Sequence, residues 1–125
     1  MKEFRELTKA EDQVMQVLWK LEKGFVKDIL EHLPEPKPAY NTISTIVRIL
    51  ENKGFVGHKA YGKTHEYYPI IAKDKYTKQY VNAMVKGYFN GSFHNLVSFF
   101  ARENKVDIHE LEKLLDELKK KKGDA

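Results

Sequence analysis

The stretch that decides the fold spans residues 40–70 and reads YNTISTIVRILENKGFVGHKAYGKTHEYYPI. Its first part is helical in pattern, because apolar residues recur at i, i+3, i+4 and i+7: Ile43, Ile46, Val47 and Leu50. Lys53-Gly54 then supplies a basic last turn and a C-terminal cap. In the second part, Phe55-Val56 and residues 66–70 are rich in aromatic and β-branched side chains, and Tyr61-Gly62-Lys63-Thr64 separates them. The stretch therefore predicts a helix followed by a β-hairpin with a basic tip.

Two more helices are predicted before this stretch. Residues 8–21 carry an apolar stripe at helical spacing, and Thr8-Lys9-Ala10-Glu11 has the form of a capping box. Residues 26–33 carry a second stripe, which ends at the prolines of residues 34–38. Three helices followed by a β-ribbon are typical of a winged helix-turn-helix domain, in which the third helix enters the DNA major groove and the ribbon contacts the DNA backbone.

Three further helices are predicted after the hairpin. The first runs from Lys73 to the Asn90-Gly91 turn, the second from Phe93 to Arg102 after a Ser92 cap, and the third follows a cap at Asp107. We therefore expect a mainly α protein with a small β-hairpin wing. Residues 1–72 would form the winged-helix DNA-binding domain, and residues 73–125 an α-helical dimerisation domain.

The second domain carries more apolar side chains than three short helices can bury among themselves. A second copy of the chain would cover them, and an intramolecular core is the alternative. The residues expected at the dimer contact are Tyr80, Met84, Tyr88, Phe93, Leu96, Val97, Phe100, Leu111, Leu115 and Leu118.

Composition excludes several classes of protein. The 125 residues contain no cysteine and no apolar run approaching the roughly 20 residues of a membrane span. The charged start of the chain, residues 1–6, is followed by no apolar signal segment, so we expect a cytoplasmic protein. His58 and His65 flank the hairpin tip and could face each other across it, but two imidazoles without a nearby Asp or Cys make a poor metal site. We expect no enzyme, no catalytic residue, no metal and no cofactor.

Positive charge gathers on the predicted third helix and wing. Residues 36–65 hold five Lys or Arg and one acid, Glu51, which gives a net charge of +4. Such cations would neutralise the phosphates of double-stranded DNA. The residues expected to bind DNA are Tyr40, Asn41, Thr42, Ser44, Thr45 and Arg48 on the helix and Lys59, Tyr61, Gly62, Lys63 and Thr64 on the wing. An ordinary solvated helix face, or a winged-helix module that binds only proteins, remains the alternative.

These residues carry a family resemblance. Thr8-Lys9-Ala10-Glu11, Val14-Met15, Val17-Leu18-Trp19, Tyr40-Asn41-Thr42-Ile43-Ser44-Thr45 and Lys53-Gly54-Phe55-Val56 together resemble the penicillinase repressor family (BlaI/MecI/CopY) of bacterial transcriptional regulators. The resemblance covers nearly the whole chain and implies a homodimeric repressor of a palindromic operator, with half-sites about one helical turn (~34 Å) or a multiple of it apart.

The resemblance also implies a route of derepression. In several members, a membrane-bound sensor with a metalloprotease domain leads to cleavage of an Asn-Phe bond in the C-terminal domain. Aligned on Leu96-Val97, that bond falls at Phe99-Phe100, so the Asn is missing here. Ser44 stands where many members carry Arg, so the operator sequence is expected to differ. The cysteine pairs of copper-responsive members are absent.

Overall fold

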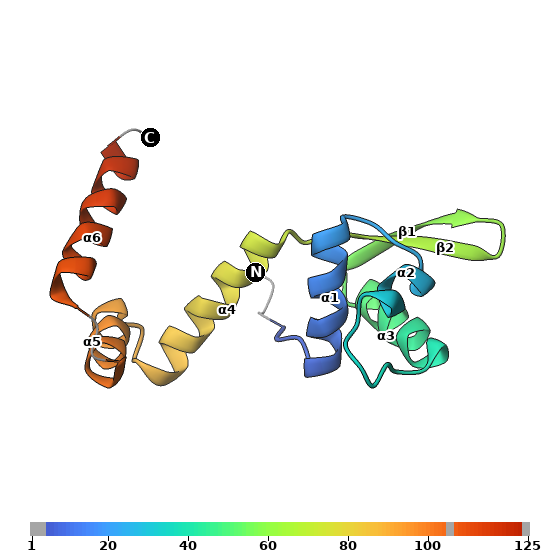
Figure 1. Ribbon diagram of the computed structural model, residues 1–125, viewed down its shortest axis with the longest axis horizontal. Coiled ribbons are helices and arrows are strands. Elements are labelled where there is room, and N and C mark those ends of the chain that lie inside the picture. Colours follow the sequence, from blue (N-terminus) through green and yellow to red (C-terminus); the bar gives the residue numbers. More distant parts are fainter. Residues whose placement is uncertain (1–4, 105–106, 124–125) are drawn as a thin grey trace. The chain divides into compact units, whose positions relative to one another are not determined.

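The computed structural model describes residues 5–104 and 107–123, so the first four residues of the charged N-terminal segment lie outside it (Figure 1). No helix in these ranges is both long enough and apolar enough to cross a membrane. The chain divides into two units, Met1–Tyr80 and Val81–Ala125. The elements are α1 (Lys9–Leu21), α2 (Val26–Glu31), α3 (Tyr40–Asn52), β1 (Val56–Tyr61), β2 (Thr64–Pro69), α4 (Lys73–Tyr88), α5 (Phe93–Asn104) and α6 (Ile108–Gly123).

The element order confirms the predicted architecture, which is mainly helical with one antiparallel hairpin after the third helix. The capping box of α1 is formed. The Glu11 amide donates to Thr8 Oγ1 at 3.2 Å, and the Thr8 amide donates to Glu11 Oε1 at 2.9 Å. These bonds satisfy two amides that the first turn of a helix leaves unpaired.

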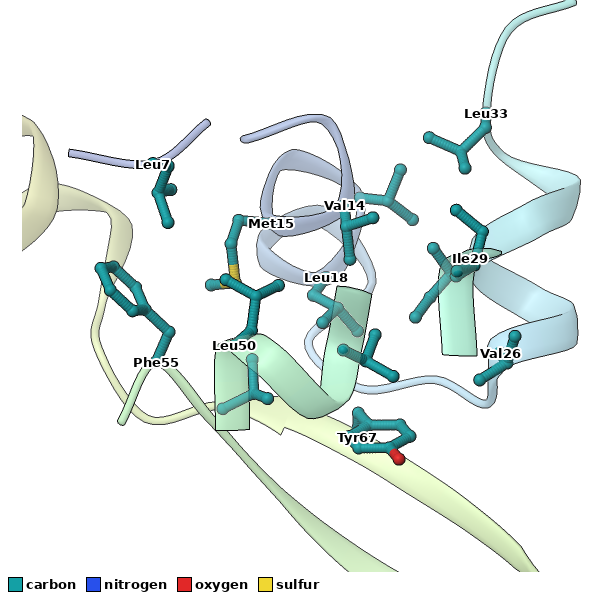
Figure 2. Packing of buried hydrophobic residues seen from close by; sticks show 14 of the residues in the cluster. Leu7, Val14, Met15, Leu18, Val26, Ile29, Leu33, Leu50, Phe55 and Tyr67 are labelled. Carbon is teal, nitrogen blue, oxygen red and sulfur yellow. The ribbon is translucent and has the colours of Figure 1, made fainter. Parts of the chain in front are cut away.

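The core of the first unit fixes α3 in place. Figure 2 shows side chains from α1, α2, α3 and the base of the hairpin converging on one cluster. Leu18, Ile29 and Val47 are completely buried there, and Tyr67 of β2 closes the cluster from the hairpin side. Because the apolar stripe of α3 points into this core, its polar residues must point outward.

Helix α2 is shorter than predicted, because it ends at Glu31 rather than Leu33. Beyond it, the Lys37 ammonium donates to three backbone carbonyls, those of Leu30 (3.1 Å), Glu31 (3.0 Å) and Leu33 (2.8 Å). A cation there satisfies carbonyls that the end of a helix leaves unpaired. Leu33 is outside the helix but remains buried in the core.

The hairpin is longer than predicted. Tyr61 and Thr64 form the last strand pair, so the four residues expected to separate the strands reduce to a turn of Gly62 and Lys63. Gly62 has φ +62°, a left-handed conformation that two-residue turns require. Pro69 lies at the end of β2, as predicted, and pairs with Val56.

The second unit has helix caps at the predicted places. Ser92 Oγ accepts from the Asn95 amide at 3.1 Å, and Asp107 Oδ1 accepts from the His109 amide at 2.9 Å. Helix α5 continues beyond the predicted end at Arg102 to Asn104. Among the described residues of this unit, only Val85 is buried.

Candidate nucleic-acid interface

The outer face of α3 is polar. Tyr40, Asn41, Thr42, Thr45 and Arg48 are exposed, and Ser44 is half-buried, as expected from the sequence. The N-cap residue, Ala39, offers no capping side chain. The amide end of α3 therefore keeps the partial positive charge that favours a phosphate.

Two hydrogen bonds along α3 determine what its outer face presents. Thr45 Oγ1 donates to the Asn41 carbonyl at 3.0 Å, so its hydroxyl proton is engaged while its methyl group and acceptor lone pairs stay available. Arg48 Nη2 donates to Ser44 Oγ at 3.0 Å. Ser44 thus orients the guanidinium of Arg48, a role that its position on the helix did not indicate.

The wing carries the predicted basic tip. Lys59, Lys63 and Thr64 are exposed, and Thr64 Oγ1 donates to the Tyr61 carbonyl across the turn at 2.9 Å. The Lys59 ammonium lies 5.3 Å from the centre of the Tyr61 ring, a cation–π distance. These contacts order the tip while leaving both ammonium groups open to solvent.

A groove of about 760 Å³ lies between α2, α3 and the wing. Its two acids are engaged within the protein: Asp28 accepts from the Phe25 amide at 2.9 Å, and Glu51 bonds to His58 at 2.6 Å. Its lysine and arginine side chains have no ion-pair partner within the described residues. Because its three cations, Lys27, Arg48 and Lys63, outnumber its two acids, the groove favours an anion. Its lining residues are Phe25, Val26, Lys27, Asp28, Tyr40, Ser44, Arg48, Glu51, His58, Lys63, Thr64, His65 and Tyr67.

Two lysines of the predicted basic excess have structural roles instead. Lys37 holds the end of α2, and the Lys53 ammonium lies 2.8 Å from Glu11 Oε2. Burial alone would raise the pKa of Glu11, but the Lys53 ammonium and the Thr8 hydrogen bonds outweigh burial and lower it. Counting charge along the sequence overestimated the cations available to DNA.

Eight of the thirteen groove residues were not predicted to bind DNA, and three of these eight are basic: Lys27, His58 and His65. Lys27 gave no signal, because an exposed lysine on a short helix is ordinary. His58 and His65 were expected to make a phosphate contact or to lie on the surface rather than to bind a metal, and they were left out of the predicted DNA-binding set. Their rings stack, with centres 4.1 Å apart and 9° between planes. The described residues contain no group of three or more potential metal ligands. Burial and the nearby Glu51 carboxylate raise the pKa of Tyr67, so its phenol remains neutral on the groove wall.

Comparison with known proteins identifies the family. A family model described as penicillinase repressor matches residues 7–120. The chain belongs to the penicillinase repressor family. The repressor is 31% identical to the methicillin resistance regulatory protein MecI of Staphylococcus aureus (strain N315), over 93% of this chain and 95% of MecI. It is 26% identical to the penicillinase repressor of Bacillus licheniformis, over 98% of both chains.

A solved structure resembles part of the repressor. The solution structure of the DNA binding domain of the repressor BlaI matches with a TM-score of 0.51 and 28% identity, over 60% of this chain and 93% of that chain. The repressor is accordingly a transcriptional regulator of the BlaI/MecI type and not an enzyme.

Proposed function

We propose that the repressor binds a palindromic operator as a homodimer, with α3 in the major groove and the wing against neighbouring phosphates. The observation that supports the proposal is the groove, where Tyr40, Ser44 and Arg48 of α3 and Lys63 and Thr64 of the wing line one surface whose two acids are hydrogen-bonded within the protein. The other proposed DNA contacts lie outside the groove lining: Asn41, Thr42 and Thr45 on α3 and Lys59, Tyr61 and Gly62 on the wing. A DNA backbone has the charge and the shape to enter such a groove.

The proposed roles follow from the contacts of each side chain. Asn41, Thr42 and Thr45 read base edges, because amide and hydroxyl groups match adenine and the Thr methyl matches thymine. Arg48, held by Ser44, contacts either guanine or phosphate. The remaining proposed contacts are to phosphate and sugar: Tyr40 on α3 and Lys59, Tyr61, Gly62, Lys63 and Thr64 on the wing.

Dimerisation is proposed from the exposed apolar surface of the C-terminal helices. Phe100 is 55% exposed and Leu115 is 56% exposed, whereas large apolar side chains in a hydrophobic core are almost completely buried. Of the other residues of the proposed contact, Tyr80, Tyr88, Phe93, Val97 and Leu118 are exposed, whereas Met84, Leu96 and Leu111 are half-buried. The exposed side chains Ile108 and Leu114 extend this surface.

Derepression by a membrane-bound sensor protease system is proposed from the family resemblance. The aligned bond joins Phe99 and Phe100, which lie within α5 and are about half exposed. A helical bond must unwind locally before a protease can bind it. We place the repressor in the cytoplasm. Mass spectrometry of the protein isolated from induced cells tests whether the bond between Phe99 and Phe100 is cleaved. Fragments ending at Phe99 would support it, and intact protein in derepressed cells would contradict it.

The first test is selection of duplexes from random sequence, read against salt concentration, with the solution mass measured alongside. A palindrome bound by a dimer is expected.

Replacing Arg48, Lys59 and Lys63 together with Ala should lower the slope of log affinity against log salt by about one for each phosphate that is no longer neutralised. The matched control replaces Lys20, Lys113 and Lys119, which lie outside the groove. Unchanged binding in the first variant would favour the protein-binding alternative.

Base readout has its own test in Thr45→Ala. Because this change removes the methyl and acceptor groups that face outward, we expect discrimination between the selected operator and random DNA to fall by about 1–3 kcal/mol. Binding to random DNA should change little. Equal losses on both duplexes would reject the role proposed for Thr45.

A further inference from the structure

The wing extends beyond the hydrophobic core, since its buried apolar side chains are Val56 and Tyr67 at its base. The base is anchored by backbone bonds: the Gly24 amide donates to the Tyr67 carbonyl at 2.9 Å, and the Tyr67 amide donates to the Gly24 carbonyl at 2.8 Å. Residues 58–65 are exposed. A two-stranded ribbon has little stability of its own, so this outer part needs further contacts to hold one orientation.

A hydrogen bond between the wing and α3 supplies such a contact. His58 Nδ1 lies 2.6 Å from Glu51 Oε2. The strand register puts His58 and His65 on the same face, where the two rings stack and restrict the His58 imidazole. At the start of α2, the Phe25 ring meets Tyr61 edge-on at 5.7 Å. The outer wing thus contacts α3 through the His58–Glu51 hydrogen bond and the start of α2 through the Tyr61–Phe25 ring contact.

Glu51 is an unexpected residue for an interface with DNA. It stands in the groove with Arg48 and Lys63, where a carboxylate by itself would repel phosphates. We propose that Glu51 and His58 are positioning residues, which hold the wing in a fixed orientation relative to α3 so that Lys63 and α3 engage one duplex together. A wing ordered before binding avoids the entropic cost of ordering it on association. The inference rests on the proposed function.

The experiment compares two substitutions of Glu51 in the full-length protein, with the selected operator duplex at one pH and one salt concentration. Glu51→Ala and Glu51→Gln both remove the negative charge, but only Gln keeps an acceptor for the imidazole N–H. Gln should bind at least as tightly as wild type, whereas Ala should bind about three- to tenfold more weakly than Gln, the range for removal of one hydrogen bond. His58→Ala should bind at least as weakly as Glu51→Ala, because it removes the same hydrogen bond and also leaves the Glu51 carboxylate in the groove without its partner. Equal affinity of the Ala and Gln variants would overturn the inference.

A second readout separates positioning from a general effect on folding. Lys63→Ala should weaken binding less in the Glu51→Ala background than in wild type or Glu51→Gln, because a loose wing presents Lys63 poorly. Lys27→Ala, on α2, should cost the same in all three backgrounds. If Lys63→Ala weakens DNA binding by the same factor in all three backgrounds, the inference about Glu51 and His58 is overturned and the proposed function is not. A wild-type protein that selects no duplex overturns the proposed function and the inference with it.

Discussion

The two units of the molecule bury their apolar residues very differently. The first buries a continuous cluster that runs from Leu7 to Tyr76, whereas the described part of the second buries only Val85. Both have well-formed, capped helices. A segment can therefore form capped helices without burying the apolar side chains that those helices carry. The first unit has one continuous hydrophobic core, whereas the described helices of the second leave most of their large apolar side chains exposed.

The largest effect is expected from Leu115→Asp in the second unit. If a second copy covers Leu115, the change buries an unpaired charge and should weaken association by about 3–5 kcal/mol. Sedimentation should then show a monomer, and affinity for the full palindrome should fall about a hundredfold or more. Lys113→Asp, an exposed position on the same helix, is the control and should leave the dimer intact. If the Leu115→Asp protein remains dimeric, Leu115 does not lie in the dimer contact.

A smaller effect is expected from Leu18→Ala in the first unit. Leu18 is 0% exposed, so the truncation should cost about 2–5 kcal/mol of unfolding free energy, independent of protein concentration. Leu118→Ala, at 50% exposure, is the matched truncation in the second unit. In urea unfolding, the loss of unfolding free energy caused by Leu118→Ala should be small in dilute protein. It should increase with protein concentration as dimers form. If both truncations cost the same in dilute protein, the second unit has a core of its own.

The smallest of these effects is expected from Glu11→Gln, which removes the charge that pairs with Lys53 across the first unit. We expect a decrease in unfolding free energy of about 1–2 kcal/mol near pH 7. Because the folded-state pKa of Glu11 is lowered, its stabilisation is fully present above the unfolded-state value of about 4.3 and disappears as pH falls through the folded-state value. Urea unfolding should therefore give a difference between wild type and variant that disappears in acid. A difference that persists at low pH would contradict this assignment.

Local patterns predicted the fold well. The capping box at Thr8 and Glu11 and the caps at Ser92 and Asp107 were predicted because such motifs are contained within a few residues. The hairpin length was missed, because Gly62 allows a tighter turn than the four polar residues suggested. These errors concern the ends of elements and not their order.

Long-range pairing limited prediction of the site. Lys53 lies 42 residues from Glu11 in the chain, and nothing near either residue indicates the pair. The Glu51–His58 bond likewise depends on how α3 packs against the wing. The outer face of α3 was predictable, because the apolar stripe alone determines which residues point away from the core. The role of Ser44 in holding Arg48 required the structure.

The exposed apolar side chains of the second unit make operator binding depend on the amount of repressor in the cell, if they pair as proposed. If operator binding requires the proposed dimer, and most protomers are single, the abundance of the binding form follows the square of the protomer concentration. Modest dilution by growth, or removal of a fraction of the chains, would then release the operator disproportionately. Repression would respond steeply to protein level without a ligand or a conformational switch.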